Sequence, residues 1–273
     1  MNPLDAESIR APIAELPGAC LEILEVFSEI ESTNSYLLDQ PAPPPGRFRV
    51  ALADFQTAGR GRMNRAWQSP PSSGLCLSMA YTFQQVSTGL PALTLSLGVG
   101  VVEALQRFGI DGISLKWPND IIADGGKLGG ILTEARHGRS NNVTVVAGVG
   151  LNVDLPDDMQ TLDEPPLTNR IVDLGNCTDK PPSREELSVA VIESLFECLV
   201  RFESDGFAAF RDDWQKYDWL FGRQIAVARL DEHYSGIADG VDDDGALIIR
   251  TDKGRRRVID GTVTFPENTG DCA

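Results

Sequence analysis

The chain has 273 residues, of which 42% are hydrophobic, and its 40 Asp and Glu residues outnumber its 24 Lys and Arg residues, giving a net charge of −16. This length suits a large domain followed by a small one, or a single large α/β unit, and the hydrophobic content is sufficient for a buried core. Because an acidic protein repels phosphate backbones and anionic membranes, the charge balance argues against extended DNA binding and against membrane binding.

The apolar periodicity predicts strands and helices interspersed along most of the chain. In chain order we expect a strand at 21–30, a short helix at 35–39, strands at 50–55 and 75–81, a core helix at 93–108, a strand at 113–117, a strand pair at 128–135 and 143–153, a long helix from a capping box at 183–186 to about 206, and a helix at 207–219. The strand at 75–81 alternates apolar with small or polar residues, so we expect it to be half-buried. The acidic, proline-containing stretch at 154–170 is typical of a surface loop.

Beyond Gly222 the pattern changes to short alternating strands, such as 224–228 and 247–250, joined by Asp-Gly and Lys-Gly turns. These short strands predict a small β-barrel. We therefore divide the chain into a larger domain at 1–221 and a small C-terminal domain at 222–273.

A run of cations interrupts the acidic chain between Gln56 and Trp67. It contains the turn Gly59-Arg60-Gly61-Arg62 and a further arginine, Arg65. Glycine lets backbone N–H groups approach an anion closely, and guanidinium groups offer several donors to phosphate or carboxylate. The run therefore predicts an anion-binding loop, in keeping with a nucleotide ligand.

Further polar or glycine-rich clusters lie where strand patterns end, at 32–34, 116–120, 125–130 and 148–152. Each is a weak signal alone, because a lysine beside glycines is commonly an exposed turn, a tryptophan such as Trp67 is commonly core, and 32–34 also fits a plain helix cap. The glycines do not form a P-loop, since Ile121 and Leu128 stand where a glycine and a Ser or Thr are needed. Nor do they form a dinucleotide fingerprint, because Asn64 and Val153 occupy the place of the third glycine.

Taken in order, these clusters resemble those of biotin protein ligases, which activate biotin with ATP and attach it to a lysine of a carboxylase carrier domain. The resemblance extends from about Leu21 to the end and rests on Ser32-Thr33-Asn34, Gly59-Arg60-Gly61-Arg62, Lys116-Trp117-Pro118-Asn119-Asp120, Gly126-Lys127-Leu128-Gly129-Gly130-Ile131-Leu132 and Gly150-Leu151-Asn152. The motifs at 60–62 and 116–120 separate this family from lipoate-attaching enzymes, which share the fold but not both motifs. The resemblance implies an α+β fold with a mixed β-sheet and packed helices, like that of class II synthetases, followed by an SH3-like β-barrel.

The resemblance also implies roles for the matched residues. Biotin would be bound by Ser32, Thr33, Asn34, Gln56, Gly59, Arg60, Gly61, Arg62, Lys127 and Gly130. ATP would be bound by Arg62, Arg65, Trp67, Lys116, Asn119, Asp120, Lys127 and Asn152. The residues expected to act on the reacting groups are Lys127, Arg62, Lys116 and Asp120. Magnesium would assist at a site whose ligands the sequence does not identify, and we expect Asp120 to accept the proton of the acceptor lysine.

The remaining predictions concern location and partners. Five scattered cysteines without a Cys-x-x-Cys pair, and an N-terminus without the pattern of a secretion signal, predict a cytoplasmic protein. Thirty-one residues precede Ser32, short of the ~50 that a folded domain usually needs, so we expect no DNA-binding domain there. His137 and His233 fall in expected turns without a nearby nucleophile, so we expect no histidine-dependent chemistry.

The sequence leaves two further functions open beside biotin ligation, namely lipoate or octanoate attachment on the same scaffold and non-catalytic binding of biotin or a nucleotide. It also leaves a homodimer open, because an edge strand that pairs between subunits has the same pattern as one capped by a loop.

Overall fold

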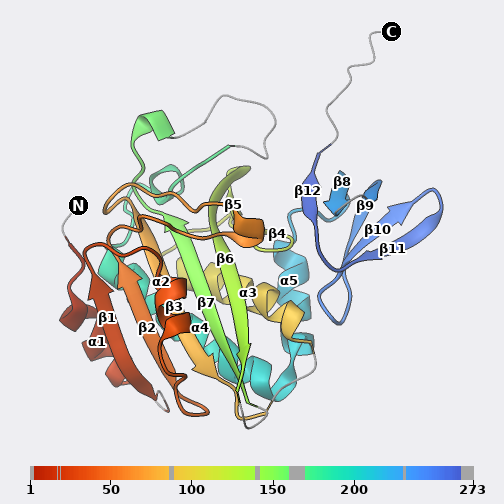
Figure 1. Ribbon diagram of the computed structural model, residues 1–273. Coiled ribbons are helices and arrows are strands. Elements are labelled where there is room, and N and C mark those ends of the chain that lie inside the picture. Colours follow the sequence, from red (N-terminus) through yellow and green to blue (C-terminus); the bar gives the residue numbers. More distant parts are fainter. Residues whose placement is uncertain are drawn as a thin grey trace.

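The computed structural model describes residues 3–16, 18, 20–85, 89–138, 142–159, 170–229 and 232–265. Its centre is a mixed seven-stranded sheet (Figure 1) in the order β1-β2-β3-β7-β6-β5-β4. The strands are β1 (Leu21–Phe27), β2 (Phe48–Ala53), β3 (Gly74–Thr82), β4 (Ser114–Lys116), β5 (Asp120–Ala123), β6 (Gly126–His137) and β7 (Val143–Asn152). The first pair is parallel and all other neighbours are antiparallel, which confirms the mixed sheet.

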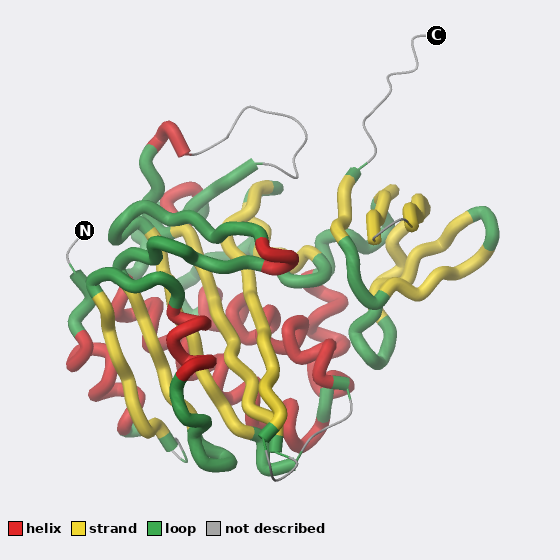
Figure 2. The backbone as a smooth tube through the Cα atoms, in the orientation of Figure 1, coloured by secondary structure: helices red, strands yellow, loops and turns green. Residues whose placement is uncertain are grey.

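Helices cover the two faces of this sheet unequally (Figure 2). Among the helices of the described residues, one face carries α1 (Ala6–Ala14), α3 (Leu93–Gln106), α4 (Arg184–Asp205) and α5 (Arg211–Tyr217), and the other carries α2 (Thr33–Asp39) alone. Short 3-10 segments lie at Arg62–Asn64, Leu90–Ala92, Asp157–Met159, Leu174–Asn176 and Phe207–Phe210. None of the helices in the described ranges combines the length and the apolar character needed to cross a bilayer.

The main core lies between the sheet and the layer of four helices. On β3, Leu75, Leu77, Met79 and Tyr81 belong to this core. A smaller cluster on the opposite face packs Leu37 of α2 against neighbouring strands, including Ala80 of β3. All nine residues of β3 are consequently buried, so the half-buried strand expected from its alternation was wrong: tertiary structure covers both faces.

Local signals located the long helix correctly. Ser183 accepts a hydrogen bond from the Glu186 N–H, and the Glu186 carboxylate accepts one from the Ser183 N–H, which confirms the capping box. Gly206 ends the helix with a φ of 63°, a conformation that glycine adopts without steric cost.

Two elements were missed because their local signals are weak. Helix α1 contains Pro12 and buries only Ile9 and Ile13, and strand β5 has four residues. His137 and His233 lie in β6 and β9 rather than in the expected turns, and both are exposed. Of the loop expected at 154–170, residues 160–169 lie outside the described residues.

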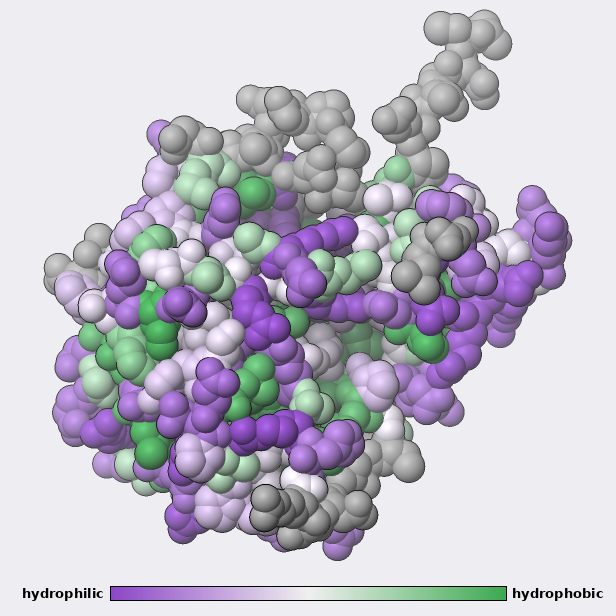
Figure 3. Space-filling model, viewed as in Figure 1, coloured by the Kyte–Doolittle hydropathy of each residue, from purple (hydrophilic) through white to green (hydrophobic). Residues whose placement is uncertain are grey.

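The C-terminal part is a separate five-stranded antiparallel sheet in the order β11-β10-β9-β8-β12. Its strands are β8 (Gln224–Arg229), β9 (Glu232–Val241), β10 (Leu247–Thr251), β11 (Gly254–Val258) and β12 (Thr262–Thr264). Hydrophilic residues cover its projecting hairpin, whereas hydrophobic patches are scattered over the larger sheet in the same view (Figure 3). The two parts are in contact, since the indole N–H of Trp117 donates to the Gly245 carbonyl at 3.0 Å.

Candidate functional site

A pocket of about 190 Å³ lies on the face of the large sheet that carries α2, next to the C-terminal sheet. Its lining includes most of the residues singled out from the sequence, namely Ser32, Thr33, Asn34, Gln56, Arg60, Gly61, Arg62, Arg65, Trp67, Lys116, Asn119, Asp120, Lys127 and Gly130. These residues come from α2, from the arginine run, from the β4–β5 turn and from β6. The fold therefore brings together clusters that are separated by up to 98 residues in the chain, the span from Ser32 to Gly130.

One wall of the pocket is a chain of hydrogen bonds at the start of α2. The Thr33 N–H donates to Gln56 Oε1 at 2.8 Å, and the Thr33 and Ser78 hydroxyl groups lie 2.7 Å apart. Ser78 donates to Asn34 Oδ1 at 2.6 Å, and the Asn34 amide N–H donates to Glu134 at 3.1 Å. Because each group is held by another, the wall presents donors and acceptors in fixed places, as recognition of a small polar ligand requires. Ser32 caps the helix through its hydroxyl, which accepts from the Ser35 N–H.

The glycines of β7 allow neighbouring side chains to approach the sheet closely. A Cβ atom at Gly148 would lie 2.2 Å from Asn34 Oδ1, and one at Gly150 would lie 2.5 Å from the Trp67 indole. Real Cβ atoms do not come this close to other heavy atoms, so these positions must remain free of side chains. The cluster at 148–152 therefore acts as a flat floor against which Asn34 and Trp67 pack.

The arginine run, residues 56–67, folds into a small hairpin over the pocket, which we call the arginine loop. Arg60 pairs with Ala66 as an antiparallel bridge, and the Trp67 N–H donates to the Gly59 carbonyl at 2.9 Å. At the tip, Met63 has a φ of 54°, a left-handed conformation that is unfavourable for a residue with a side chain.

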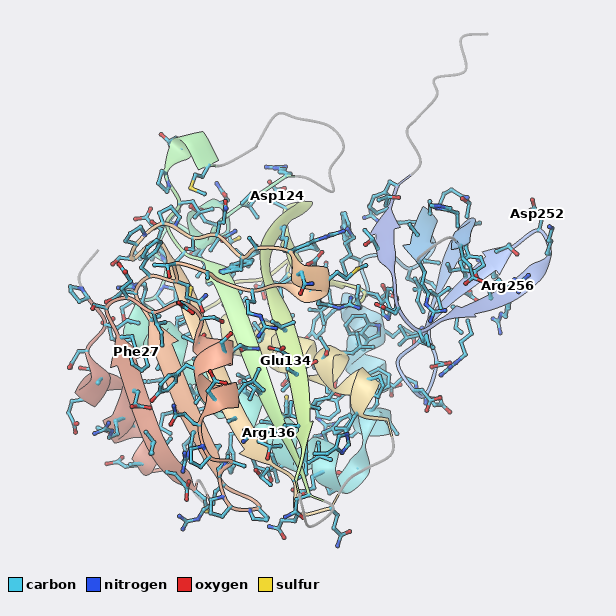
Figure 4. All side chains as sticks on the ribbon, viewed as in Figure 1. Phe27, Asp124, Glu134, Arg136, Asp252 and Arg256 are labelled. Carbon is cyan, nitrogen blue, oxygen red and sulfur yellow. The ribbon has the colours of Figure 1, made fainter. Side chains whose placement is uncertain are left out.

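Arg60 is turned toward β6, where its two terminal nitrogens donate to the Glu134 carboxylate at 3.0 and 2.7 Å. Glu134 lies in the second half of β6, beside α2 (Figure 4). This two-point pair fixes the base of the arginine loop against the large sheet.

Besides Arg60, which is paired with Glu134, four cations line the pocket and come from three parts of the chain: Arg62, Arg65, Lys116 and Lys127. The Lys127 ammonium donates to Asp120 Oδ1 at 2.5 Å, across the β5–β6 pair. Lys116 is buried, and its ammonium forms no hydrogen bond or ion pair with the residues that the structure describes. Burial lowers the pKa of Lys116, and the nearby Lys127 and Arg65 lower it further, while Asp120 opposes the shift. A pocket with this charge attracts polyanions.

Two residues named from the sequence do not line the pocket. Gly59 packs against the Trp67 backbone, where a Cβ atom would be 2.4 Å from the carbonyl oxygen. Its lack of a side chain therefore lets the two ends of the arginine loop pair. Asn152 is buried beneath the pocket and donates to the carbonyl groups of Val172 at 2.9 Å and Lys127 at 3.4 Å. Asn119, which does line the pocket, donates to the Ile131 carbonyl at 3.0 Å.

The sequence interpretation missed the contributions of β3 and of the C-terminal sheet to the pocket. Ser78 and Cys76 of β3 lie on the strand face opposite the main core, a position that alternation alone does not distinguish from solvent exposure. Burial raises the pKa of Cys76 to about 11, which keeps this thiol protonated at neutral pH and argues against a nucleophilic role. The segment 261–263 enters from the C-terminal sheet, for which the sequence carried no site signal.

The described residues contain no cluster of three or more His, Cys, Asp or Glu side chains that could hold a metal ion by themselves. Asp120 is the one carboxylate among the described lining residues of the pocket.

Comparison with known proteins places the chain in a family. Residues 26–152 match the model of the biotin/lipoate A/B protein ligase family, and residues 220–265 match that of the biotin protein ligase C terminal domain. The chain is 31% identical over 258 residues to the bifunctional ligase/repressor BirA of Escherichia coli, covering 92% of this chain and 75% of that protein. It is 30% identical over 264 residues to the biotin--[acetyl-CoA-carboxylase] ligase of Mycobacterium tuberculosis, covering 94% and 93%.

Among solved structures, the biotin protein ligase of Aquifex aeolicus in complex with biotin and ATP superposes with a TM-score of 0.70 at 27% identity, covering 90% of this chain and 97% of that one. This solved structure shares the fold of the chain. The chain belongs to the biotin protein ligase family.

Proposed function

We propose that the protein activates biotin with ATP to form biotinyl-5'-AMP and then transfers biotin to a lysine of a biotin carboxyl carrier domain. The observation that carries this proposal is the convergence of four cations on a pocket whose opposite wall is a fixed polar array. The Aquifex aeolicus relative was solved with both biotin and ATP, which supports the same pair of ligands here.

In the first step, the carboxylate of biotin attacks the α-phosphate of ATP and pyrophosphate leaves. A carboxylic acid with a pKa of about 4 to 5 is already ionised at neutral pH, so this step needs no general base. The pocket must instead bring two anions together, and Lys127, Lys116 and Arg62 lower their repulsion and hold them in line. The polar array of residues 32–34 with Gln56 is placed to hold the compact ureido ring of biotin.

Magnesium fits this arrangement. The ion is usually bound by one or two carboxylates together with phosphate oxygens, and Asp120 provides one carboxylate beside Lys127 and Lys116. When bound, magnesium would neutralise charge on the triphosphate. The protein residues would orient that triphosphate, with Trp67 and the segment at 119–120 on the nucleoside side.

In the second step, the amine of the acceptor lysine attacks the carbonyl carbon of the mixed anhydride, the bond to the phosphate breaks and AMP leaves. The lysine must first lose a proton, because its reference pKa is about 10.4. We assign the role of proton acceptor to Asp120. The ion pair with Lys127 gives Asp120 a second role, which is to hold the Lys127 ammonium in place.

A reconstituted reaction tests the function directly. The protein with ATP, magnesium and biotin should release pyrophosphate, and a purified carrier domain should become labelled with biotin. Octanoate or lipoate should not replace biotin, and binding of biotin without pyrophosphate release would show a non-catalytic binder instead.

A matched pair of lysine variants links the reaction to the pocket. Lys127→Ala should slow pyrophosphate release by about 100-fold or more, since it removes a charge beside the reacting groups. Lys253→Ala, in the exposed β10–β11 turn, should leave the rate unchanged. Equal rates for the two variants would contradict the assignment of Lys127.

The role of Asp120 requires a separate measurement of the second step. With preformed biotinyl-5'-AMP and carrier domain, Asp120→Asn should slow transfer. The slowing should diminish as the pH approaches the pKa of the free lysine, because the acceptor then needs no base. Transfer at the wild-type rate would show that Asp120 is not the base.

A further inference from the structure

The tip of the arginine loop is attached to the C-terminal sheet. The residues that hold the tip, Asp260 and Thr262, belong to none of the sequence motifs. Arg62 Nη2 donates to Asp260 Oδ1 in an ion pair, and Arg65 Nη2 donates to Thr262 Oγ1 at 3.0 Å. The Thr262 hydroxyl also contacts Met63 Sδ at 3.8 Å. Three residues at the loop tip therefore meet one short segment, 260–262, that lies almost 200 residues further along the chain.

This segment is a rigid support. Asp260 Oδ1 also accepts the Gly261 N–H at 2.8 Å, which fixes the carboxylate. Gly261 has a φ of 152°, and a Cβ atom there would lie 2.7 Å from a methyl group of Val227, so the chain is pressed against β8 at this point. Thr262 begins β12, which pairs with β8.

Each contact uses one nitrogen of a guanidinium group and leaves the others available. Arg62 Nε and Nη1 form no hydrogen bond with the residues that the structure describes, yet the Arg62 side chain lines the pocket. Lys127 shows the same arrangement on the other side, where Asp120 accepts one of its three N–H groups. Arg62, Arg65 and Lys127 are thus each anchored by one protein acceptor and retain free donors.

We propose that Asp260, supported by Thr262, is a positioning residue for nucleotide binding: it holds Arg62 so that the remaining guanidinium N–H groups face the triphosphate. This inference rests on the proposed function, because that function supplies the triphosphate. It makes the C-terminal sheet a structural part of the nucleotide site. It also explains how the loop tip keeps the unfavourable backbone conformation at Met63.

The direction of the change in nucleotide affinity distinguishes positioning of Arg62 by Asp260 from simple repulsion between Asp260 and the phosphates. Removing a carboxylate near a phosphate site should strengthen phosphate binding if only its charge matters. The Asp260 side chain is 49% exposed, so water screens its field at the phosphate. An unanchored arginine must instead lose rotamer freedom when it binds the ligand, which weakens binding. We therefore expect Asp260→Asn to weaken nucleotide affinity.

The test is a double-mutant cycle on the dissociation constant of a non-hydrolysable ATP analogue, measured by calorimetry with biotin present. Asp260→Asn should raise this constant about two- to five-fold, the range expected for a partly exposed ion pair. Asp260→Glu, which keeps a carboxylate, should recover part of the loss. In an Arg62→Ala background, Asp260→Asn should have no further effect.

Asp252→Asn is the matched control, because Asp252 lies at the tip of the β10–β11 hairpin, away from the large sheet (Figure 4). It should change neither the dissociation constant nor the melting temperature, and the melting temperature of Asp260→Asn should equal that of the control.

Three results would overturn the inference: tighter or unchanged analogue binding by Asp260→Asn, equal weakening in the Arg62→Ala background, or no analogue binding by the wild type. Analogue binding that follows the expected cycle in a protein that releases no pyrophosphate would overturn only the proposed function.

Discussion

Replacing Asp218 by asparagine should change the free energy of unfolding, relative to the wild type, more favourably at neutral pH than at acidic pH. The reason is that this carboxyl group is buried where the chain leaves α5 for the C-terminal sheet. One of its oxygens accepts the Leu220 N–H at 2.9 Å, while the other is buried without a hydrogen-bond partner among the described residues. Burial raises the pKa of Asp218 from 3.8 to about 6. The adjacent residue, Trp219, is bonded to β4 one position before Lys116, so the junction also supports the pocket.

The magnitude follows from the pKa difference between the folded and unfolded chains. Below pH 3.8 the carboxyl group is protonated in both states. As the pH rises from 3.8 to about 6, the unfolded chain loses the proton first, so the free energy of unfolding falls, and the loss is complete above about pH 6. A shift of about 2 units at about 1.4 kcal/mol each sets an upper value near 3 kcal/mol, of which about 2 kcal/mol should develop between about pH 4 and about pH 8.

Urea unfolding followed by tryptophan fluorescence at the two pH values measures this difference. Asp218→Asn keeps the acceptor for the Leu220 N–H, and the cost of its buried amide is the same at both pH values, so it cancels. Asp252→Asn, an exposed substitution in the C-terminal hairpin, controls for the loss of one negative charge. If Asp218→Asn and the wild type differ by the same free energy at both pH values, the carboxyl group is not held protonated by burial and the reasoning fails.

Three further predictions concern the pocket. Gly150→Ala should displace Trp67, since the new Cβ would lie 2.5 Å from the Trp67 ring, and it should weaken ATP-analogue binding about 10-fold, the scale of a misplaced binding group. The control variant Gly138→Ala, in the β6–β7 turn, should bind the analogue normally. Normal binding by both variants would refute the displacement of Trp67. ATP-analogue affinity should fall as the pH rises through the lowered pKa of Lys116, because phosphate binding favours the protonated amine, and Lys116→Arg should flatten this profile. Parallel pH profiles for the variant and the wild type would refute this reasoning. Biotin with ATP should slow tryptic cleavage within residues 60–65 as the arginine loop closes, and equal cleavage rates with and without ligands would count against closure.

Much of the candidate site could be predicted from the sequence because its signals are local. The cap at Ser32 and the arginine turn depend on neighbours within a few residues, and the structure places both of them at one pocket. The long helix was equally local, since its capping box and its final glycine lie at its own ends.

Pairing between distant residues was not predictable in the same way. Lys127 could have been assigned any nearby carboxylate, and its pairing with Asp120 follows from the register of β5 against β6, a short strand that periodicity did not reveal. The burial of Ser78 likewise depends on α2 covering the second face of β3. The pairing of Arg62 with Asp260 joins residues 198 positions apart.

By itself, the sequence determined which residues were available for chemistry, because backbone preferences, caps and charge clusters are set within a few positions. Tertiary structure alone decided which anion holds each cation, and that the C-terminal sheet supplies one of them. The physical reason is that an ion pair requires contact within a few ångströms, and contact between distant segments depends on strand register and on the packing of the two sheets.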